Sequence, residues 1–376
     1  MKNIKTIGIL GGGQLARMMV LETKRLGFDF LVLDPTPACP AAQVGAKQII
    51  GSFKDPEKIA LLAEKVDVIT FDIEHVNTQK LNELEQQGVV IRPSPKILDI
   101  IQDKLKQKML LKEAGIPIPR FLNQEDLTQA AKLLGYPFVQ KLRHGGYDGQ
   151  GVLVIKSEED LKDAFKENFY VEEAIAIEKE IAVLVARSPQ GEIKVYPVVE
   201  MLFDVRANIC DEVLCPARID ESLAAKAQEI AFQVIEALGE GAVGIFAVEM
   251  FLSKEGDILV NEIAPRPHNS GHFTLDGCIT SQFEQHIRAI AGLPLGATDL
   301  LIPTMMINLL GEGQGTPVIE GFEEALSLEG VHIHLYGKKE VRPFRKMGHV
   351  NIVDRNIDQV VKKAMKVKEI LHVKGE

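Results

Sequence analysis

Two apolar segments rich in β-forming residues, 246–251 and 258–263, are separated by a short polar stretch, and this pattern predicts a β-hairpin. If the turn is centred between residues 255 and 256, Glu249 lies directly opposite Glu262, and the Cβ atoms of such a pair are roughly 4.5–5.5 Å apart. Two carboxylates at about 4 Å repel by about 4 kcal/mol in an effective dielectric of about 20. A sheet that holds this pair therefore needs a positive charge beside it.

The residues around the second carboxylate indicate which cation this is. Asn261 precedes Glu262, and carboxylate and amide oxygens are the hard ligands that suit magnesium carrying nucleotide phosphates. Arg266, His268 and His272 follow within ten residues, so cationic and proton-transferring groups lie close by. We predict a magnesium site with phosphate chemistry next to it. The alternative is a surface hairpin whose two carboxylates point into water.

Composition limits the class of protein. A chain of 376 residues can hold two or three domains, and a net charge of −10 argues against general nucleic-acid binding. No apolar run is long enough to span a membrane, and residues 1–4 lead directly into a core-like strand, so we expect no membrane association and no signal peptide. The cysteines form no CxxC pair, which favours reduced thiols in a cytoplasmic protein over a zinc site. They are Cys39, Cys210, Cys215 and Cys278.

The first 34 residues predict a phosphate-binding βαβ unit. A strand over 6–10 leads into Gly11-Gly12-Gly13, a helix follows over 14–26, and a second strand over 30–33 ends at Asp34. The pattern fits the dinucleotide fingerprint, but glycines and a helix N-terminus suit any phosphate-bearing ligand. An NAD-dependent dehydrogenase would explain only this segment.

A further strand, 68–71, delivers Asp72, Glu74 and His75 at its carboxyl end, where open α/β sheets bind ligands. The alternative is a solvated strand end. Residues 92–95, Arg-Pro-Ser-Pro, have the composition of a linker that closes this unit.

The middle of the chain predicts a glycine flap. After a helix over 104–114, a strand over 138–142 carries Lys141 and is followed by the loop 144–151, which holds four glycines, and by a strand over 152–155. Such a loop can cover a triphosphate through its N–H groups, with Lys141 as a point charge. The connector 170–175 and Glu180 could meet adenine and ribose, although single strand carboxylates are more often exposed.

A basic run near the end of the chain predicts an anion site. Residues 338–346 contain five cations and one anion within an acidic protein. Such runs are usually solvated, but the glycine, the proline and the adjoining strand 331–336 favour a phosphate clamp.

Taken in their order along the chain, these motifs resemble those of an ATP-grasp ligase, and most closely those of the 5-(carboxyamino)imidazole ribonucleotide synthetase family. The stretches Ala-Pro-Arg-Pro-His-Asn-Ser-Gly-His (264–272) and Arg-Lys-Met-Gly-His (345–349) carry the resemblance, which covers the whole chain. It implies an α/β protein with an ATP-grasp fold: an N-terminal Rossmann-like (pre-ATP-grasp) domain over 1–97, an ATP-grasp domain over 98–300 with a flap subdomain at about 120–185, and a small β-rich C-terminal domain over 301–376. It also implies a homodimer.

The resemblance further implies the site residues. ATP would be bound by Arg92, Lys141, Gly146, Tyr147, Asp148, Gly149, Gln150, Gly151, Val152, Glu172, Glu173, Ala174, Ile175, Glu180, Asn261 and Glu262. Magnesium would be held by Glu249 and Glu262. The substrate, 5-aminoimidazole ribonucleotide, would be bound by Gln14, Leu15, Glu74, Asn269, Lys338, Arg345 and Lys346. Tyr147, Asp148, Arg266 and His268 would surround the reacting centre.

The implied reaction is an ATP- and bicarbonate-dependent carboxylation of the substrate amine through carboxyphosphate, a step of purine biosynthesis. The alternative from the same superfamily is the formate-dependent glycinamide ribonucleotide transformylase, which typically has an aspartate where this chain has Asn269. Two departures from the family pattern stand out: neutral Gln150 replaces a flap cation, for which Arg143 or His144 could compensate, and residues 200–204 lack a usual nucleotide contact.

Overall fold

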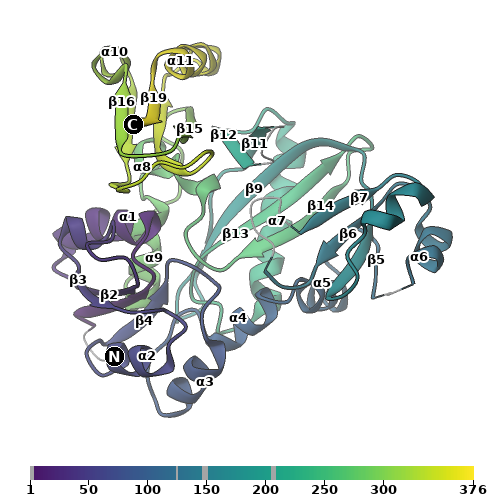
Figure 1. Ribbon diagram of the computed structural model, residues 1–376, viewed down its shortest axis with the longest axis horizontal. Helices are drawn as coiled ribbons and strands as arrows, with labels where there is room; N and C mark the ends of the chain where they lie inside the picture. Colours follow the sequence, from purple (N-terminus) through teal and green to yellow (C-terminus); the bar gives the residue numbers. More distant parts are fainter. Residues whose placement is uncertain (1–3, 124–125, 146–150, 205–208) are drawn as a thin grey trace.

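The computed structural model describes residues 4–123, 126–145, 151–204 and 209–376 (Figure 1). Within these ranges the strands form three sheets, which we call the N-terminal sheet, the flap sheet and the central sheet. No helix in the described part of the chain is both long and apolar enough to cross a membrane.

The N-terminal sheet is parallel, with strand order β3-β2-β1-β4. Its strands are β1 (Thr6–Leu10), β2 (Asp29–Asp34), β3 (Lys47–Ile50) and β4 (Val68–Phe71), and its helices are α1 (Gln14–Thr23), α2 (Pro56–Ala63) and α3 (Thr78–Gln86). The predicted strands 6–10 and 68–71 are confirmed. The predicted helix 14–26 is α-helical only to Thr23 and ends in a 3-10 turn that Gly27 closes with a positive φ.

The flap sheet is antiparallel, with strand order β5-β8-β6-β7. Its strands are β5 (Phe121–Leu122), β6 (Phe138–Leu142), β7 (Val152–Ile155) and β8 (Phe169–Glu173), and helix α6 (Leu127–Leu134) covers it. Strands β6 and β7 occupy the predicted residues. In Figure 1 this sheet lies at the side of the molecule away from the N-terminal sheet.

The central sheet contains eleven strands and runs from the hairpin β13–β14 into the C-terminal part of the chain, along the path β14-β13-β9-β11-β12-β15-β18-β17. Its strands are β9 (Ile177–Arg187), β10 (Ile193–Val195), β11 (Val199–Asp204), β12 (Ile209–Cys215), β13 (Gly244–Ser253), β14 (Ile258–Ala264), β15 (Thr304–Gly313), β16 (Pro317–Glu320), β17 (Val331–Leu335), β18 (Lys346–Val353) and β19 (His372–Gly375). The helices that accompany it are α4 (Pro95–Ile101), α5 (Lys104–Glu113), α7 (Glu221–Leu238), α8 (Thr274–Gly277), α10 (Phe322–Leu326) and α11 (Ile357–Ile370).

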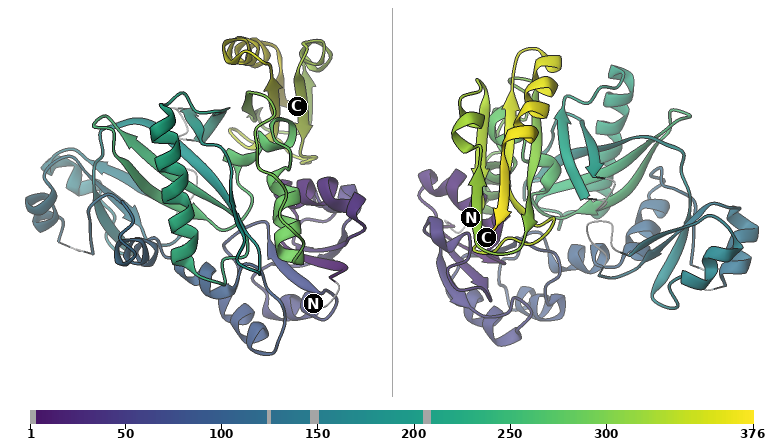
Figure 2. Two further views of the ribbon diagram at one scale, coloured as in Figure 1. Left: turned by 180° about the vertical axis from the view of Figure 1, so that it is seen from behind. Right: turned by 45° about the horizontal axis from the view of Figure 1, so that its top comes forward.

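Helix α9 (Gln282–Ala291) joins parts of the chain that are far apart in sequence. Its apolar face, with Phe283, Ile287 and Ile290, packs into the core of the N-terminal sheet beside α1 (Figures 1 and 2). Thr70 Oγ1 and His286 Nε2 are 2.7 Å apart in this buried contact. The N-terminal sheet therefore depends for its core on residues more than 180 positions later in the chain.

Residues 92–95 form a packed connection rather than a loose linker. The backbone N–H of Arg92 donates to Ile69 O at 2.9 Å, and that of Ser94 donates to Gly241 O at 2.9 Å. Pro95 is the first residue of α4, a position that proline favours because its missing N–H is not needed there. The predicted domain boundaries at 97 and 300 stay predictions.

Candidate active site

The hairpin β13–β14 places Glu249 directly opposite Glu262, as predicted. The predicted turn centre between residues 255 and 256 is wrong, because Met250 pairs with Val260 and the turn is therefore centred on residue 255. The register then shifts by one residue, with Asn261 as the extra residue of a β-bulge. The register shift at the bulge offsets the error in the predicted turn centre, so Glu249 still faces Glu262. The bulge also presents Asn261 and Glu262 side by side.

Lys104 supplies a positive charge that the sequence analysis did not assign. It is the first residue of α5, and its Nζ forms an ion pair with Glu262. A cation at a helix N-terminus opposes the helix dipole, so this position requires an anionic partner. Burial would raise the pKa of Glu262, but the charge and hydrogen bond of Lys104 outweigh it and the pKa is lowered.

The pKa of Glu249 is shifted in the opposite direction. Burial raises its pKa to about 8, and the negative charges of Glu262 and Glu180 add to the rise. His268 Nε2 lies 3.3 Å from Glu249 Oε1, and burial, with a further contribution from Arg266, lowers the pKa of His268 to about 4. Near neutral pH the metal-free protein therefore carries a protonated Glu249 beside a neutral imidazole. Such displaced pKa values are typical of functional sites.

Lys141 connects the flap sheet to the hairpin. Its Nζ donates to Asn261 Oδ1 at 2.8 Å and lies 2.9 Å from Glu172 Oε2. The Glu172 carboxylate also binds Lys108 Nζ at 2.9 Å and the Tyr170 hydroxyl at 2.9 Å, and Glu172 is only 1% exposed. Its side chain is thus fully engaged by residues of the protein.

The other predicted ATP residues lie in different settings. Glu180 is half-buried on β9, where burial raises its pKa. Glu173, at the end of β8, accepts from the backbone N–H of Arg120 at 2.7 Å and pairs with its guanidinium. Arg92 lies elsewhere, against helix α9, where its Nη1 donates to Ile290 O at 2.6 Å. The structure therefore brings Lys141, Glu172, Asn261 and Glu262 together but places Arg92 at the N-terminal sheet.

The predicted substrate side adjoins the carboxylate pair. Arg266 Nε lies 2.6 Å from Glu74 Oε2, which joins the end of β14 to the end of β4. Burial would raise the pKa of Glu74, but Arg266 holds it at about 2. Asn269 exchanges two hydrogen bonds with Asn308 on β15, at 2.9 and 2.8 Å. These contacts bring residues of the N-terminal, central and C-terminal parts of the chain to one place.

The basic run packs against the N-terminal sheet. Gln43 Nε2 donates to Gly337 O at 2.9 Å, and Lys339 Nζ donates to Pro37 O at 3.3 Å. Lys338 Nζ donates to Lys346 O at 2.5 Å, and Arg345 Nη1 donates to Glu340 O at 2.7 Å. The loop is therefore folded on itself as a compact cationic edge rather than extended into solvent.

The glycine turn before α1 is already occupied by the protein. Asp72 accepts hydrogen bonds from the backbone N–H groups of Gly13 and Ala16, and Asp34 accepts one from Gly12 at 2.8 Å. These carboxylates take the backbone donors that a dinucleotide pyrophosphate would use. The geometry therefore disfavours the dehydrogenase alternative.

Comparisons with known proteins agree with this arrangement. Three family models match: the ribonucleotide synthetase preATP-grasp domain over residues 4–102, the ATP-grasp domain over 109–283, and the phosphoribosylaminoimidazole carboxylase C-terminal domain over 304–363. The N5-carboxyaminoimidazole ribonucleotide synthase of Bacillus subtilis is 39% identical, over 94% of this chain and 92% of its own. The crystal structure of N5-carboxyaminoimidazole ribonucleotide synthetase from Thermotoga maritima is 54% identical, with a TM-score of 0.93 over 99% of this chain and 100% of that one. The chain belongs to the N5-carboxyaminoimidazole ribonucleotide synthetase family.

Two further comparisons concern a relative that was solved with ligands and relatives that are longer than this chain. The Aspergillus clavatus N5-carboxyaminoimidazole synthase, solved with ADP and 5-aminoimidazole ribonucleotide, is 34% identical, with a TM-score of 0.89 over 98% of this chain and 99% of that one. The chain spans only 65–67% of the length of the phosphoribosylaminoimidazole carboxylases of Vigna aconitifolia, Ogataea methanolica and Schizosaccharomyces pombe, to which it is 41–42% identical. The ATP-grasp fold with its N-terminal and C-terminal domains is thus established for this chain.

The donor set fits the predicted metal. Within the described ranges no three or more His, Cys, Asp or Glu side chains are arranged to hold a metal ion. Magnesium does not need such a cage, because it takes one or two carboxylates and completes its shell with water and phosphate oxygens. Glu249 and Glu262 meet that requirement, and the negative charge of Glu262 adds to the burial that raises the pKa of Glu249.

Five predicted synthetase residues, Gly146, Tyr147, Asp148, Gly149 and Gln150, lie outside the described residues. Gly151 and Val152, at the start of β7, are described and lie beside the end of β6. Arg143, which could compensate for Gln150, is held in a two-point contact with Asp103, at 3.1 and 2.6 Å. Asp103 is the N-cap of α5, so this contact supports the helix that carries Lys104.

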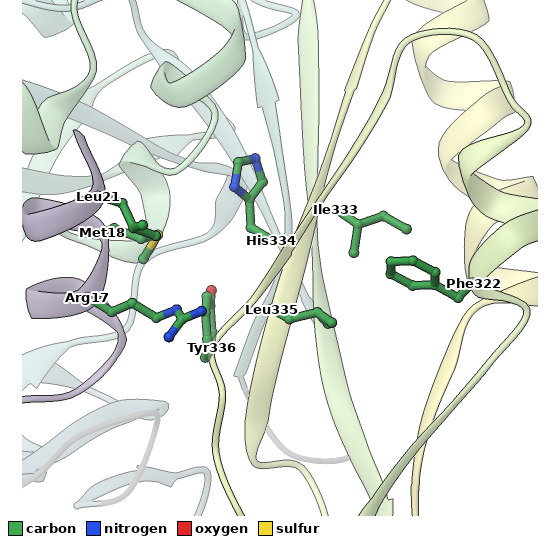
Figure 3. Close-up of a pocket in the computed structure, with 8 residues that line it drawn as sticks. All are labelled: Arg17, Met18, Leu21, Phe322, Ile333, His334, Leu335 and Tyr336. Atoms are coloured by element: carbon green, nitrogen blue, oxygen red, sulfur yellow. The ribbon is translucent and has the colours of Figure 1, made fainter. Parts of the chain in front are cut away.

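A cavity of about 290 Å³ lies between α1 and β17 (Figure 3). Arg17, Met18 and Leu21 line it from α1, and His334 and Tyr336 are among the residues on the opposite side. None of its lining residues is among those predicted for the nucleotide, the metal or the substrate. We therefore assign the active site to the carboxylate hairpin and not to this cavity.

Proposed function

We propose that this protein carboxylates the amino group of 5-aminoimidazole ribonucleotide, using ATP and bicarbonate, in purine biosynthesis. The observation that carries the proposal is the facing pair Glu249 and Glu262, with Lys104 on Glu262, His268 beside Glu249, and Lys141 and Arg266 on the nearby Asn261 and Glu74. The Aspergillus clavatus relative, solved with ADP and the same ribonucleotide, supports both ligands.

The nucleotide would lie between the flap sheet and the hairpin. Lys104 and Lys141 would bind phosphate oxygens, and Glu249 and Glu262, with Asn261 beside them, would hold magnesium. When bound, the metal would offset phosphate charge as it develops during transfer. The connector over residues 172–175 would offer backbone groups to adenine, as the family resemblance implies.

Bicarbonate oxygen would attack the γ-phosphorus of ATP and release ADP, and the resulting carboxyphosphate would pass its carboxyl group to the substrate amine and release phosphate. Arg266 would offset negative charge at the reacting centre. Asp148 is the candidate acceptor of the amine proton that the family resemblance implies, and Tyr147 and His268 would lie beside the reacting centre. The substrate phosphate would lie between the start of α1 (Gln14, Leu15) and Lys338, Arg345 and Lys346, with Glu74 and Asn269 around the rest of the molecule.

The experiment is ADP release with ATP and magnesium, comparing 5-aminoimidazole ribonucleotide plus bicarbonate against glycinamide ribonucleotide plus formate. We expect ADP release only with the first pair, and labelled bicarbonate to enter an acid-labile product. Turnover with the second pair alone would reassign the chain to the transformylase reaction. Sedimentation of the same sample tests the homodimer that the family resemblance implies, and cell fractionation tests the cytoplasmic location.

A further inference from the structure

Helix α5 contacts the β-bulge of β14 with three side chains on one face. Residues 104, 107 and 108 lie one turn apart, so their side chains project in the same direction. Lys104 pairs with Glu262, Gln107 Oε1 accepts from the Ile263 N–H at 3.1 Å, and Lys108 Nζ donates to Val260 O at 3.1 Å. The helix therefore binds the strand directly before, within and after the bulge.

Strand β14 lies at the edge of the central sheet, so its backbone groups that point away from β13 need partners outside the sheet. Gln107 and Lys108 supply two of those partners here, on either side of the bulge. Both side chains are buried, at 2% and 1% exposed, so water cannot take over the hydrogen bonds. The conformation that presents Asn261 and Glu262 is thus set by α5 and not by the hairpin alone.

Lys108 also acts on Lys141. Both ammonium groups bind the same carboxylate, with Lys108 on Glu172 Oε1 and Lys141 on Glu172 Oε2, each at 2.9 Å. Lys141 in turn donates to Asn261 at 2.8 Å. Without Lys108, Lys141 would be the only cation on the Glu172 carboxylate, whose other oxygen would keep only the Tyr170 hydroxyl, and the Lys141 ammonium would be drawn away from Asn261 and the phosphate site.

We infer that Lys108, with Gln107, is a positioning residue of the nucleotide site: it touches no substrate but fixes Asn261 and Glu262 through the bulge, and Lys141 through Glu172. This inference rests on the proposed nucleotide site but not on the identity of the ribonucleotide substrate. It predicts that losing Lys108 weakens nucleotide binding even in a protein that remains folded.

The test is the affinity of full-length Lys108→Met for ADP with magnesium, measured by calorimetry without ribonucleotide or bicarbonate. Methionine keeps the apolar part of the lysine side chain. The buried cluster then holds one lysine and one glutamate, Lys141 and Glu172, and has no net charge, so the variant should fold. We expect the dissociation constant to rise about tenfold. Lys106→Met, on the exposed side of the same helix, is the matched control and should leave it unchanged.

A double-mutant cycle with Lys141→Met separates positioning from general stability. If Lys108 acts through Lys141, adding Lys108→Met to the Lys141→Met protein should cost less affinity than it costs the wild type. Gln107→Met provides a second, independent variant that disturbs only the bulge, and we expect it also to weaken ADP binding. A lowered melting temperature with unchanged ADP affinity in both single variants would overturn the inference. A wild-type protein that binds ADP but does not turn over the ribonucleotide would reject the proposed reaction and leave the positioning role intact.

Discussion

Individual ion pairs set the charge states of this site. Glu74 and Arg266 form a close pair across the N-terminal and central sheets, and the pKa of Glu74 is held at about 2 against the opposing effect of burial. Glu262 is kept ionised by Lys104, while Glu249 has its pKa raised to about 8. Neighbouring carboxylates of one site therefore differ in protonation near neutral pH.

The Glu74 shift predicts a specific loss of stability in acid. A carboxylate whose pKa falls from 4.5 unfolded to about 2 folded stabilises the protein fully above pH 4.5 and loses that contribution as the pH falls towards 2. In Glu74→Gln the free energy of unfolding should fall less steeply between pH 4.5 and 2, with a difference of at most about 3 kcal/mol. Urea titrations at each pH measure the free energy of unfolding, and Glu236→Gln, on the exposed face of α7, is the control. Parallel pH profiles for Glu74→Gln and wild type would contradict the assignment.

The carboxylate pair makes a prediction about metal dependence. Because Glu249 is protonated in the metal-free protein near neutral pH, Glu249→Gln should change the melting temperature at pH 7 little without magnesium. Its magnesium-dependent ATP turnover should fall on the order of 100-fold, as should that of Glu262→Gln. Glu255→Gln, in the exposed turn of the same hairpin, should retain full turnover. Normal magnesium dependence in Glu249→Gln would exclude it as a ligand.

At the scale of elements, the turn between β1 and α1 shows why glycines occur there. A Cβ on Gly12 would lie 2.4 Å from Cys39 Sγ, and one on Gly13 would lie 2.6 Å from Asp72 Oδ2. The Asp72 carboxylate must come this close to accept from the N–H groups of Gly13 and Ala16. Gly13 is therefore required by an internal carboxylate cap of α1, and Gly12 by the close approach of Cys39, whatever anion binds further along the helix start.

This cap predicts the effect of a single methyl group. Gly13→Ala should displace the Asp72 carboxylate and lower the free energy of unfolding by roughly 1–3 kcal/mol, the usual cost of overpacking. Gly51→Ala is the matched control, because its Cβ would meet chiefly the flexible side chain of Lys58. Denaturant titration measures both. Equal stability of the two variants would show that the cap contributes little.

At the scale of the whole molecule, α9 ties the N-terminal sheet to the rest of the chain. Phe283, Ile287 and Ile290 are fully buried in the core that also contains Ile7, Ile9 and Val68. Tyr336, next to the basic run, belongs to the same core. The predicted phosphate clamp and the N-terminal sheet therefore share one packing unit, although their sequences lie at opposite ends of the chain.

Phe283→Ala tests this shared core. Removing a buried phenylalanine should cost about 3–5 kcal/mol, and we expect the loss to appear in the N-terminal sheet although the mutation lies outside it. Hydrogen exchange should accelerate in β1 and β4 while the flap sheet keeps its protection. Leu293→Ala, just after α9 and 39% exposed, is the control. Unchanged exchange in β1 and β4 would show that the N-terminal sheet is stable without α9.

The sequence by itself determined the local features of this protein. Strands over 6–10, 68–71, 138–142 and 152–155 could be predicted, because short apolar runs depend on neighbouring residues. The facing pair Glu249 and Glu262 was predicted from a wrong turn centre, and it depends on the bulge at Asn261. The bulge at Asn261 could not be predicted, because a one-residue shift depends on contacts outside the hairpin, and here these include Gln107 and Lys108 from a helix about 150 residues earlier. The roles of Lys104 and α9 could not be predicted either, because they too depend on contacts between distant parts of the chain. Only the tertiary structure decided which distant charges and apolar faces meet, since burial and ion pairing are properties of the packed chain.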